Sequence, residues 1–512
     1  MKKIFTLFFL STFCILGGQA QTAVVDGVKY EAVTQTTGEG DNAVTTIVSA
    51  MVAGPAADFK GGEIVIPNQV TLGDHVKYDV TKVKDHAFKG CSTIKSIVLP
   101  STVTDIDSWS FEASGLVSAD FSQTKIEHLN DGVFYQNANL TTVKLPETLK
   151  FFWNKGFEDC KSLVNIVLPP NVEAIYNEVF QNSALSSITF NDKLNYIGEH
   201  AFLGVPMTSI CFPSSLRTIK GYAFEASKLT NVVIPGNVTE MGDGVFYNNV
   251  DLKTVVINSS SVNLQWNLFR LPDGVSGGLQ HLFLTPNKAL EIGYAFVGTP
   301  YVHVQPSLVE TYKEKMSGKL DTDNINSDFP ITLSNEYATF SSAFNVDFSN
   351  IEGLKAYKGV VNGNTVTLKE VNKVLAKNGV VLNGEQGTYT AKILDSNAET
   401  DNFDSNGIWA AVDGKYLTMG TDYILSYRND VYAFRPITKS GYLRPGLAYL
   451  PLPGGASAKE FSFTFDNTPT GIGAVTTENA HKDGFYYTLG GVKMNKPAKG
   501  IYIHNGKKYF NK

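Results

Sequence analysis

The sequence has little cysteine, histidine or tryptophan, with 4, 8 and 4 of these residues among 512. So few thiols exclude a disulfide framework, and no two histidines have the H-x-H or H-E-x-x-H spacing of a common metal site. After an apolar run at the N-terminus, no segment approaches the ~18 apolar residues of a membrane-spanning helix. We therefore expect no disulfide, no bound metal and no transmembrane segment.

Clustered positive charge is missing as well. The chain has 43 Lys and Arg against 49 Asp and Glu, a formal net charge of −6, and no long run of either sign. Nucleic acids and anionic membranes attract clustered Lys and Arg, so neither is expected as a partner. The G-x-S-x-G, P-loop and dinucleotide fingerprints are also missing. The sequence therefore predicts a protein that is not an enzyme and that needs no cofactor.

The first twenty residues have the three parts of a secretory signal peptide. Lys2 and Lys3 precede the apolar run Ile4–Leu16, and small residues stand before a cut after Ala20. Cys14 offers a less favoured lipoprotein site, because the bulky Phe13 precedes it. We expect an exported protein, either at the outer-membrane surface or extracellular.

An internal repeat dominates the residues that follow. Phenylalanines recur at intervals of 22 or 23 residues, and an apolar pair two residues apart, such as Ile97 and Leu99, follows each of them. Proline often ends this segment, and a second apolar pair, such as Val103 and Ile106, comes next. The repeated phenylalanines are Phe88, Phe111, Phe134, Phe157, Phe180, Phe202, Phe224, Phe246 and Phe269, with a less regular Phe296.

Such a repeat predicts a solenoid. Apolar residues two apart point to one face of a short strand, and proline ends the strand because it has no N–H to donate. One repeat of this size cannot bury enough apolar surface to offset its loss of conformational entropy. Neighbouring coils must therefore stack, with a continuous core and a parallel sheet along one side.

The repeats resemble the BspA-type leucine-rich repeat, which reads roughly A-F-x-x-C-x-x-L-x-x-I-x-(I/L)-P. Ala87 to Ile94 and Val98 to Pro100 fit this pattern almost throughout, and the resemblance covers residues 85–315. It implies a mainly β protein whose right-handed leucine-rich-repeat solenoid has about ten repeats. The resemblance also implies a secreted or surface protein without catalytic residues, as is typical of this family in anaerobic bacteria. Some members of the family look like adhesins.

The flanking regions complete the predicted domain organisation. We expect a β capping region, the solenoid with a short helix from Ser307 to Met316, a polar linker, an all-β sandwich-like domain and a short β module. The C-terminal module resembles the sorting domains of type IX secretion, although its Asn505-Gly506 hairpin is also typical of a merely stabilising end. We expect the signal peptide at 1–20, the capping region at 21–84 and the solenoid at 85–318. The linker follows at 321–328, the all-β domain at 329–468 and the C-terminal module at 470–512.

The thiols of the repeats are predicted to stay reduced. Cys91 and Cys160 occupy the same repeat position three coils apart, so ~14 Å separates them, and a disulfide needs Cα atoms within ~7 Å. Both are expected to be small buried residues, whereas Cys211 should point away from the core. His281 and His303 should lie on adjacent coils and face outward, as solvated imidazoles rather than a metal pair.

Strand alternation leaves two outward lines of side chains on the sheet. One is almost entirely small and uncharged, from Ser96 to Thr254, which suits solubility but also suits a groove for an extended ligand. We expect an extracellular or host protein as the ligand of an adhesin or interaction scaffold, with a glycan captured from polysaccharide as the alternative. The candidate binding residues are Asn165, Ser187, Thr189, Ser209, Asn231, Thr254, His281 and Phe283.

The C-terminal module supplies a testable prediction. Truncation after Asn467 should leave the thermal unfolding of residues 21–467 nearly unchanged, because a hairpin adds little stability by itself. If the module directs sorting, the truncated protein should accumulate in the periplasm, as measured by surface labelling of intact cells. Equal labelling with and without the module would show that it has no sorting role.

Overall fold

The structure is a computed structural model, and its contacts divide the chain into two units, Met1–Phe465 and Asp466–Lys512. The predicted signal peptide and Phe296 lie outside the described residues. No helix in the part that the structure describes is long and apolar enough to cross a membrane. The described residues are 21–38, 43–264, 266–295, 298–439, 441–452, 460–466 and four short strands between 486 and 511.

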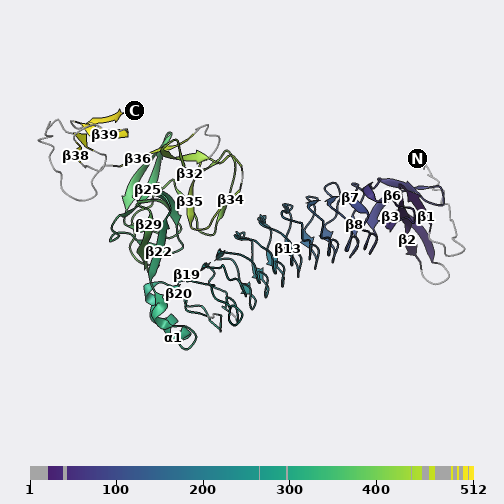
Figure 1. Cartoon of the computed structure of the whole chain (residues 1–512), viewed down its shortest axis with the longest axis horizontal. Helices are drawn as coiled ribbons and strands as arrows, with labels where there is room; N and C mark the ends of the chain where they lie inside the picture. Colours follow the sequence, from purple (N-terminus) through teal and green to yellow (C-terminus); the bar gives the residue numbers. More distant parts are fainter. Residues whose placement is uncertain are drawn as a thin grey trace, which may run out of the picture. The chain divides into compact units, whose positions relative to one another are not determined.

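A mixed sheet forms the N-terminal end and continues into the solenoid (Figure 1). In it, β6 pairs in parallel with β8, and a separate strand, β4, pairs in parallel with β7 of the first coil. Tyr30, Ala50 and Val80 are fully buried and join the core of the solenoid, so this region covers its first coil. The strands are β1 (Thr22–Val25), β2 (Val28–Thr37), β3 (Val44–Pro55), β4 (Gly62–Val65), β5 (Gln69–Thr71) and β6 (Lys77–Val83).

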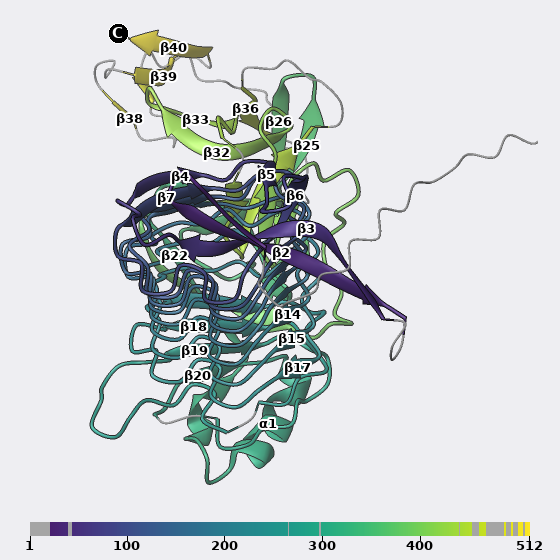
Figure 2. The same ribbon diagram turned by 90° about the vertical axis from the view of Figure 1, so that its right-hand side faces the viewer.

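The predicted solenoid is confirmed, and two rows of parallel strands run along it on different sides (Figure 2). The first row consists of β4, β7 (Ile94–Val98), β9 (Ser118–Asp120), β11 (Thr142–Lys144), β16 (Asn231–Ile234), β18 (Thr254–Ile257), β19 (His281–Leu284), β20 (Tyr301–His303) and β21 (Ile325–Asn326). The second row consists of β8 (Asp105–Ile106), β10 (His128–Leu129), β12 (Phe151–Phe152), β13 (Ala174–Ile175), β14 (Tyr196–Ile197), β15 (Thr218–Ile219) and β17 (Glu240–Met241).

The parallel sheet predicted along one side is present as the first row, and the structure adds two features that the sequence did not predict. The first row is interrupted between β11 and β16, where a single bridge joins Ser209 to Asn231. The second row is the more continuous one, and it is built by the second apolar pair of each repeat, such as Val103 and Ile106. Its strands have two residues each, which is too short for an alternating pattern to reveal them in the sequence.

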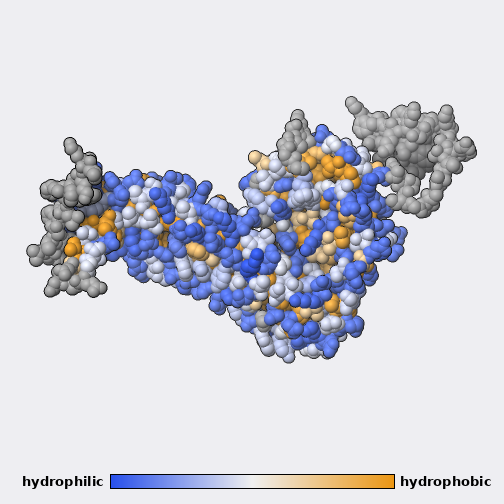
Figure 3. Space-filling model, turned by 180° about the vertical axis from the view of Figure 1, so that it is seen from behind, coloured by the Kyte–Doolittle hydropathy of each residue, from blue (hydrophilic) through white to orange (hydrophobic). Residues whose placement is uncertain are grey.

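The repeated phenylalanines form one buried stack through the solenoid, as the spacing predicts. Consecutive ring centroids lie between 5.1 and 6.0 Å apart, and their planes are inclined by 21° or less. From Phe88 to Phe269, none of the nine rings is more than 4% exposed. Such offset-stacked rings gain attraction beyond the area that they bury, so each coil stabilises its neighbours. The outer surface of the solenoid is largely hydrophilic in Figure 3.

The backbone around each phenylalanine adds a third set of contacts between coils. The Phe157 N–H donates to the carbonyl of Val179 at 2.8 Å, and the equivalent bond recurs in the other coils. The residue two positions before each of the nine phenylalanines has a positive φ, and in seven coils, for example at Trp109, Lys155 and Tyr222, it is not glycine. This conformation costs ~1–2 kcal/mol for an L-residue, and the hydrogen bonds between coils hold it in place.

The far end of the solenoid is closed by α1 (Val309–Met316), which follows the short helix η2 (Pro306–Leu308). Tyr312 is buried, and its hydroxyl accepts a hydrogen bond from the Leu290 N–H at 2.9 Å. The polar linker predicted for 321–328 is wrong in part. Its residues form η3 (Thr322–Asn324) and β21, whose Ile325 pairs with Val302, because Ile325 supplies the apolar side chain of one more coil.

An all-β domain follows, and its middle sheet takes part in two cores (Figure 1). On β28, Val380 and Leu382 face one core and Val381 faces the other. The domain therefore has one more layer than the simple two-layer sandwich that the sequence predicted. The first sheet contains β22 (Asp328–Leu333), β24 (Asn345–Asp347), β27 (Lys373–Val374) and β29 (Gly387–Leu394). The middle sheet contains β23 (Tyr337–Ser341), β25 (Leu354–Asn362), β26 (Thr365–Val371), β28 (Gly379–Gly384) and β36 (Ser462–Phe465). A third sheet contains β30 (Trp409–Ala411), β32 (Asp422–Arg428), β33 (Val431–Pro436) and β35 (Leu447–Pro451), and β31 (Lys415–Leu417) pairs with β34 (Gly441–Leu443) in a fourth.

The second unit contains a small antiparallel sheet. The C-terminal hairpin is present as β39 and β40, in which His504 pairs with Lys507, while the Asn505-Gly506 turn itself lies outside the described residues. Its strands are β37 (Tyr486–Tyr487), β38 (Lys493–Met494), β39 (Gly500–His504) and β40 (Lys507–Asn511).

The phenylalanine stack supplies a stability prediction. Phe157→Ala should lower the free energy of unfolding by about 3–5 kcal/mol, because it removes a fully buried ring from between two others. Urea denaturation followed by circular dichroism measures the loss. Val167→Ala is the control on the same coil, since Val167 is 84% exposed and should change stability by less than about 0.5 kcal/mol. Equal losses for both variants would contradict the role of the stack.

Candidate functional site

The first strand row presents two outward lines of side chains near the end of the solenoid. The register places Asn231, Thr254, His281 and Tyr301 side by side, and we call this the polar line. Two residues further along each strand, Val233, Val256, Phe283 and His303 lie side by side, and we call this the apolar line. Both lines point away from the core that the other residues of these strands form.

The all-β domain covers the part of the apolar line around Phe283. Phe283 is only 6% exposed and belongs to the core of that domain, where its ring centroid lies 5.0 Å from that of Phe329 on β22. Phe329 in turn contacts Phe340 and Phe344 edge to face. The expectation that Phe283 is exposed is therefore wrong, because a phenylalanine on a strand surface gains stability by burial against another apolar surface.

Polar contacts also join the solenoid to the all-β domain. The Ser307 N–H donates to an Asp395 carboxylate oxygen at 3.0 Å, and the Ser396 N–H donates to Oε1 of the buried Gln305 at 2.8 Å. The Asn258 amide donates to the Asp413 carboxylate, whose pKa burial raises. Polar contacts after β18 and after β20 therefore add to the apolar contact at Phe283.

A tight contact is made around Cys211. Its thiol lies beside the loops that carry Gly414 and Leu443, and a Cβ added to Gly414 would lie 2.8 Å from the Cys211 sulfur. Burial raises the pKa of this thiol to about 11, so it is protonated at neutral pH. Cys211 does point outward from the core, as predicted, but the all-β domain covers it. Cys160 is fully buried, whereas Cys91 is only half-buried, and all three thiols are free.

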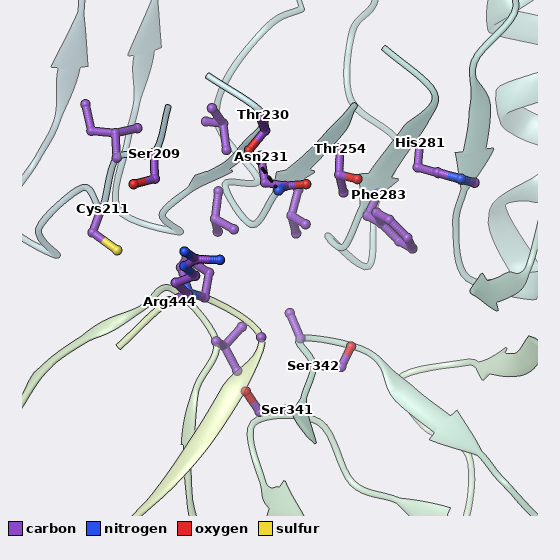
Figure 4. A pocket seen from close by; sticks show the side chains of 18 of the residues that line it. Ser209, Cys211, Thr230, Asn231, Thr254, His281, Phe283, Ser341, Ser342 and Arg444 are labelled. Carbon is purple, nitrogen blue, oxygen red and sulfur yellow. Dashed lines mark hydrogen bonds between the residues drawn. The ribbon is translucent and has the colours of Figure 1, made fainter. Parts of the chain in front are cut away.

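Beside these contacts, a cleft of about 620 Å³ remains open between the first strand row and the all-β domain (Figure 4). Solenoid residues from Ser187 to Thr285 form one side of the cleft, and Phe329, Ser342 and Arg444 belong to its other side. Figure 4 shows the Arg444 side chain directed from the all-β domain towards the side of the solenoid. A cleft of this size takes a ligand segment as large as a typical small molecule.

Seven of the eight predicted binding residues line this cleft, and Asn165 lies outside it. Asn165 accepts a hydrogen bond from the Ser187 hydroxyl at 3.4 Å on the neighbouring coil. Asn231 is exposed, Thr254 and His281 are half-buried, and Phe283 is buried at the edge of the cleft. The exposed members also include Ser187, Thr189 and Ser209.

Positive charge in the cleft comes from one side chain. Among the described residues that line it, Arg444 is the one charged group, and no Asp or Glu is present. Arg444 is exposed and makes no ion pair or hydrogen bond with the part of the chain that the structure describes. The side chains of Ser209 and Thr254 also make no hydrogen bond within the described residues. The cleft therefore offers a cation and free hydroxyl groups to a ligand.

The two histidines lie side by side, as predicted, but His303 is buried. His281 Nδ1 and His303 Nε2 are 2.9 Å apart, and His303 stacks on Phe283 with ring centroids 4.4 Å apart. Burial lowers the pKa of His303 to about 4, and the nearby His281 also lowers it. Both rings are thus neutral at pH 7. In the described part of the chain, no three His, Cys, Asp or Glu side chains are placed to hold a metal ion.

The contribution of the all-β domain was missed at the sequence level, although a signal was present. In the early coils the second outward position holds either valine or a charged residue, as at Asp120 and Lys144, whereas in three successive later coils it holds Val233, Val256 and Phe283. A run of apolar residues at one register position over successive coils indicates where another surface docks. Arg444 has no comparable signal, because it comes from a different domain.

Fold and site together define a solenoid protein with a second domain docked on its strand face. The model of the BspA type leucine rich repeat region matches residues 74–185 and 151–272, with 6 copies of the repeat. Residues 74–272 of the solenoid therefore match a BspA-type leucine-rich-repeat region, as the resemblance of the repeats indicated. A comparison with curated protein sequences gave no match.

Solved leucine-rich-repeat proteins are similar to the chain at low identity. One from Bacteroides ovatus is 21% identical, with 55% of this chain and 88% of that chain covered and a TM-score of 0.31. A leucine rich cell surface protein from Faecalibacterium prausnitzii is 21% identical, with 52% and 89% covered and a TM-score of 0.30. The pneumococcal vaccine antigen PcpA is 18% identical, with 60% and 98% covered and a TM-score of 0.28.

Burial of His303 predicts a pH dependence of the contact between the domains. Because its pKa in the folded state lies below the ~6.5 of a free histidine, the neutral ring contributes stability that is present above pH ~6.5 and lost as the pH falls towards 4. Thermal unfolding between pH 7 and 4 should therefore be less pH-dependent in His303→Gln than in the unmodified protein. His75→Gln, which changes an exposed histidine, should behave like the unmodified protein. The same pH profile in all three proteins would contradict the assignment.

The contact at Gly414 can be tested through the Cys211 thiol. Gly414→Ala should loosen the loop from the solenoid and speed the reaction of Cys211 with maleimide, measured in a Cys91→Ser background. Gly420→Ala is a matched control, because Gly420 has the same positive φ, +87° against +83°, but nothing within 4 Å of an added Cβ. Unchanged labelling in Gly414→Ala would show that this contact does not protect the thiol.

Proposed function

We propose that this protein binds an extended segment of another, extracellular protein in the cleft between its first strand row and the all-β domain. The observation that carries the proposal is that unpaired polar side chains, namely Thr189, Ser209 and Thr254, point into a cleft beside apolar side chains. Solenoids commonly use such strand faces for binding, and backbone amides of an extended chain pair well with hydroxyl groups.

A protein ligand suits the cleft better than a glycan does. Sugars stack on exposed aromatic rings, but Phe283 and Phe344 in the cleft are only 6% and 2% exposed, and the half-buried Phe329 packs against both of them. Half-buried rings do lie on the second strand row, where Trp153 and Tyr176 stack with centroids 4.5 Å apart. Capture of a polysaccharide on that side of the solenoid is the alternative function. The experiment below distinguishes it from binding of a protein in the cleft.

The role is proposed to be non-catalytic. The ionisable side chains that line the cleft are Cys211, His281 and Arg444. Cys211 and His281 stand three coils apart, at ~14 Å for strands spaced ~4.8 Å, so they cannot act as a nucleophile and its base. A binding role needs neither group to be activated.

We further propose that binding takes place outside the cell. The signal-peptide pattern of residues 1–20 supports export, and the C-terminal module supports display at the outer surface. The resemblance to surface proteins with the same repeat points in the same direction.

A bulky side chain in the cleft tests the proposed function. Ser209→Trp should lower binding to a panel of purified extracellular matrix proteins at least 10-fold, because it fills the space between the strands and the all-β domain. Thr142→Trp is the matched control, since Thr142 is exposed on β11 at the same repeat position but outside the cleft. A glycan array is probed with the same proteins.

Three outcomes would contradict the proposal. Equal protein binding by both variants would place the site outside the cleft. Binding to glycans alone would favour polysaccharide capture, and binding to neither the protein panel nor the array would remove the support for an adhesin.

A further inference from the structure

We propose that the cleft selects an acidic segment of its protein ligand, and that the Arg444 guanidinium binds a carboxylate of that segment. The inference rests on the proposed function and names the chemistry of the ligand. Three observations support it: the charge of the cleft, the hydrogen bonds that hold the loop of Arg444, and the polar groups of the solenoid opposite Arg444.

The charge of the cleft differs from that of the chain. The whole chain carries a formal net charge of −6, yet the described lining of the cleft contains no carboxylate and one guanidinium. A carboxylate on the ligand would therefore meet a cation without a competing acid from the protein. Complementary charge of this kind favours the matching partner and disfavours basic ones.

Arg444 differs from most arginines of the chain. Arg270 and Arg435 form ion pairs with Asp273 and Glu460, and Arg217 donates to backbone carbonyls. Arg444 has no such partner among the described residues. Arg428 has none either, but it lies outside the cleft, at the end of β32. Arg444 is thus the unpaired guanidinium that faces a ligand site.

The loop that carries Arg444 is held on two sides. The Gly446 N–H donates to the carbonyl of Ala411 at 3.0 Å, and the Gly446 carbonyl accepts from the Ser341 N–H at 2.8 Å. Pro445 restricts the backbone directly after the arginine. A supported loop reduces the entropy lost when the guanidinium binds, so the arginine is preorganised for a partner.

Groups for the rest of the segment lie opposite on the solenoid. The Asn231 amide nitrogen donates to the Thr230 hydroxyl at 3.2 Å, and its oxygen has no partner within the described residues, which leaves it free to accept a backbone N–H. Val233 and Val256 supply an apolar strip for neighbouring side chains. A guanidinium group binds a carboxylate through two parallel hydrogen bonds. The Asn231 amide suits the backbone of a peptide, and the two valines suit its apolar side chains. An acidic peptide fits this set better than an acidic glycan, which would need an exposed ring.

Selection from a random-peptide display library tests the inference. The full mature chain, Arg444→Gln, Arg444→Lys, Ser209→Trp and the control Arg428→Gln are each used as bait. Peptides selected by the unmodified protein and by Arg428→Gln should carry Asp or Glu at one position. A synthetic peptide of the selected sequence should bind Arg444→Gln about 10- to 100-fold more weakly, with Arg444→Lys in between, because a charge-assisted pair is lost. Replacing its acidic residue by Gln should weaken binding to the unmodified protein equally.

The outcomes separate this inference from the proposed function. Peptides that lack an acidic residue but lose binding in Ser209→Trp would overturn the role of Arg444 and leave the cleft as the protein-binding site. Peptides that bind Ser209→Trp as tightly as the unmodified protein would overturn both the inference and the proposed function. The absence of any selected peptide would do the same. Binding of an acidic glycan such as polygalacturonate in place of peptides, with the same dependence on Arg444, would overturn the choice of a protein ligand.

Discussion

Contact between successive coils is the interaction on which the structure depends. One coil has a few apolar side chains and short strands, and by itself it buries too little surface to offset its conformational entropy. The stacked rings from Phe88 to Phe269 and the backbone bonds between coils supply what one coil lacks. The same requirement explains the coverings at the two ends, where Tyr30 and Tyr312 are buried against the first and last coils.

The need to cover apolar surface also explains the position of the all-β domain. Where Val233, Val256 and Phe283 follow one another on the outward face, the strand row becomes a docking surface, and Phe329 packs on Phe283. The polar line remains uncovered beside it. The cleft is thus a consequence of a surface that is apolar along one line and polar along the next.

This arrangement gives the cleft chemistry that neither domain has alone. The solenoid supplies hydroxyl and amide groups on parallel strands, and the all-β domain supplies the guanidinium of Arg444. A proline and two backbone hydrogen bonds hold the loop of that arginine, while the polar strand side chains remain free to pair with a ligand. The result resembles an interface between two proteins in which each side contributes different groups.

The repeat, the buried phenylalanines and the outward positions could be predicted from the sequence, because coils that stack in register convert spacing along the chain directly into position in space. Seven of the eight candidate residues line the cleft for that reason, and His281 lies beside His303 as expected. The burial of Phe283 and His303, the place of Ile325 in one more coil and the direction of Arg444 towards the strands became apparent in the folded structure alone. The burial and the direction of Arg444 depend on contacts with other parts of the chain, and Ile325 lies on a strand of two residues, so no local period encodes these features.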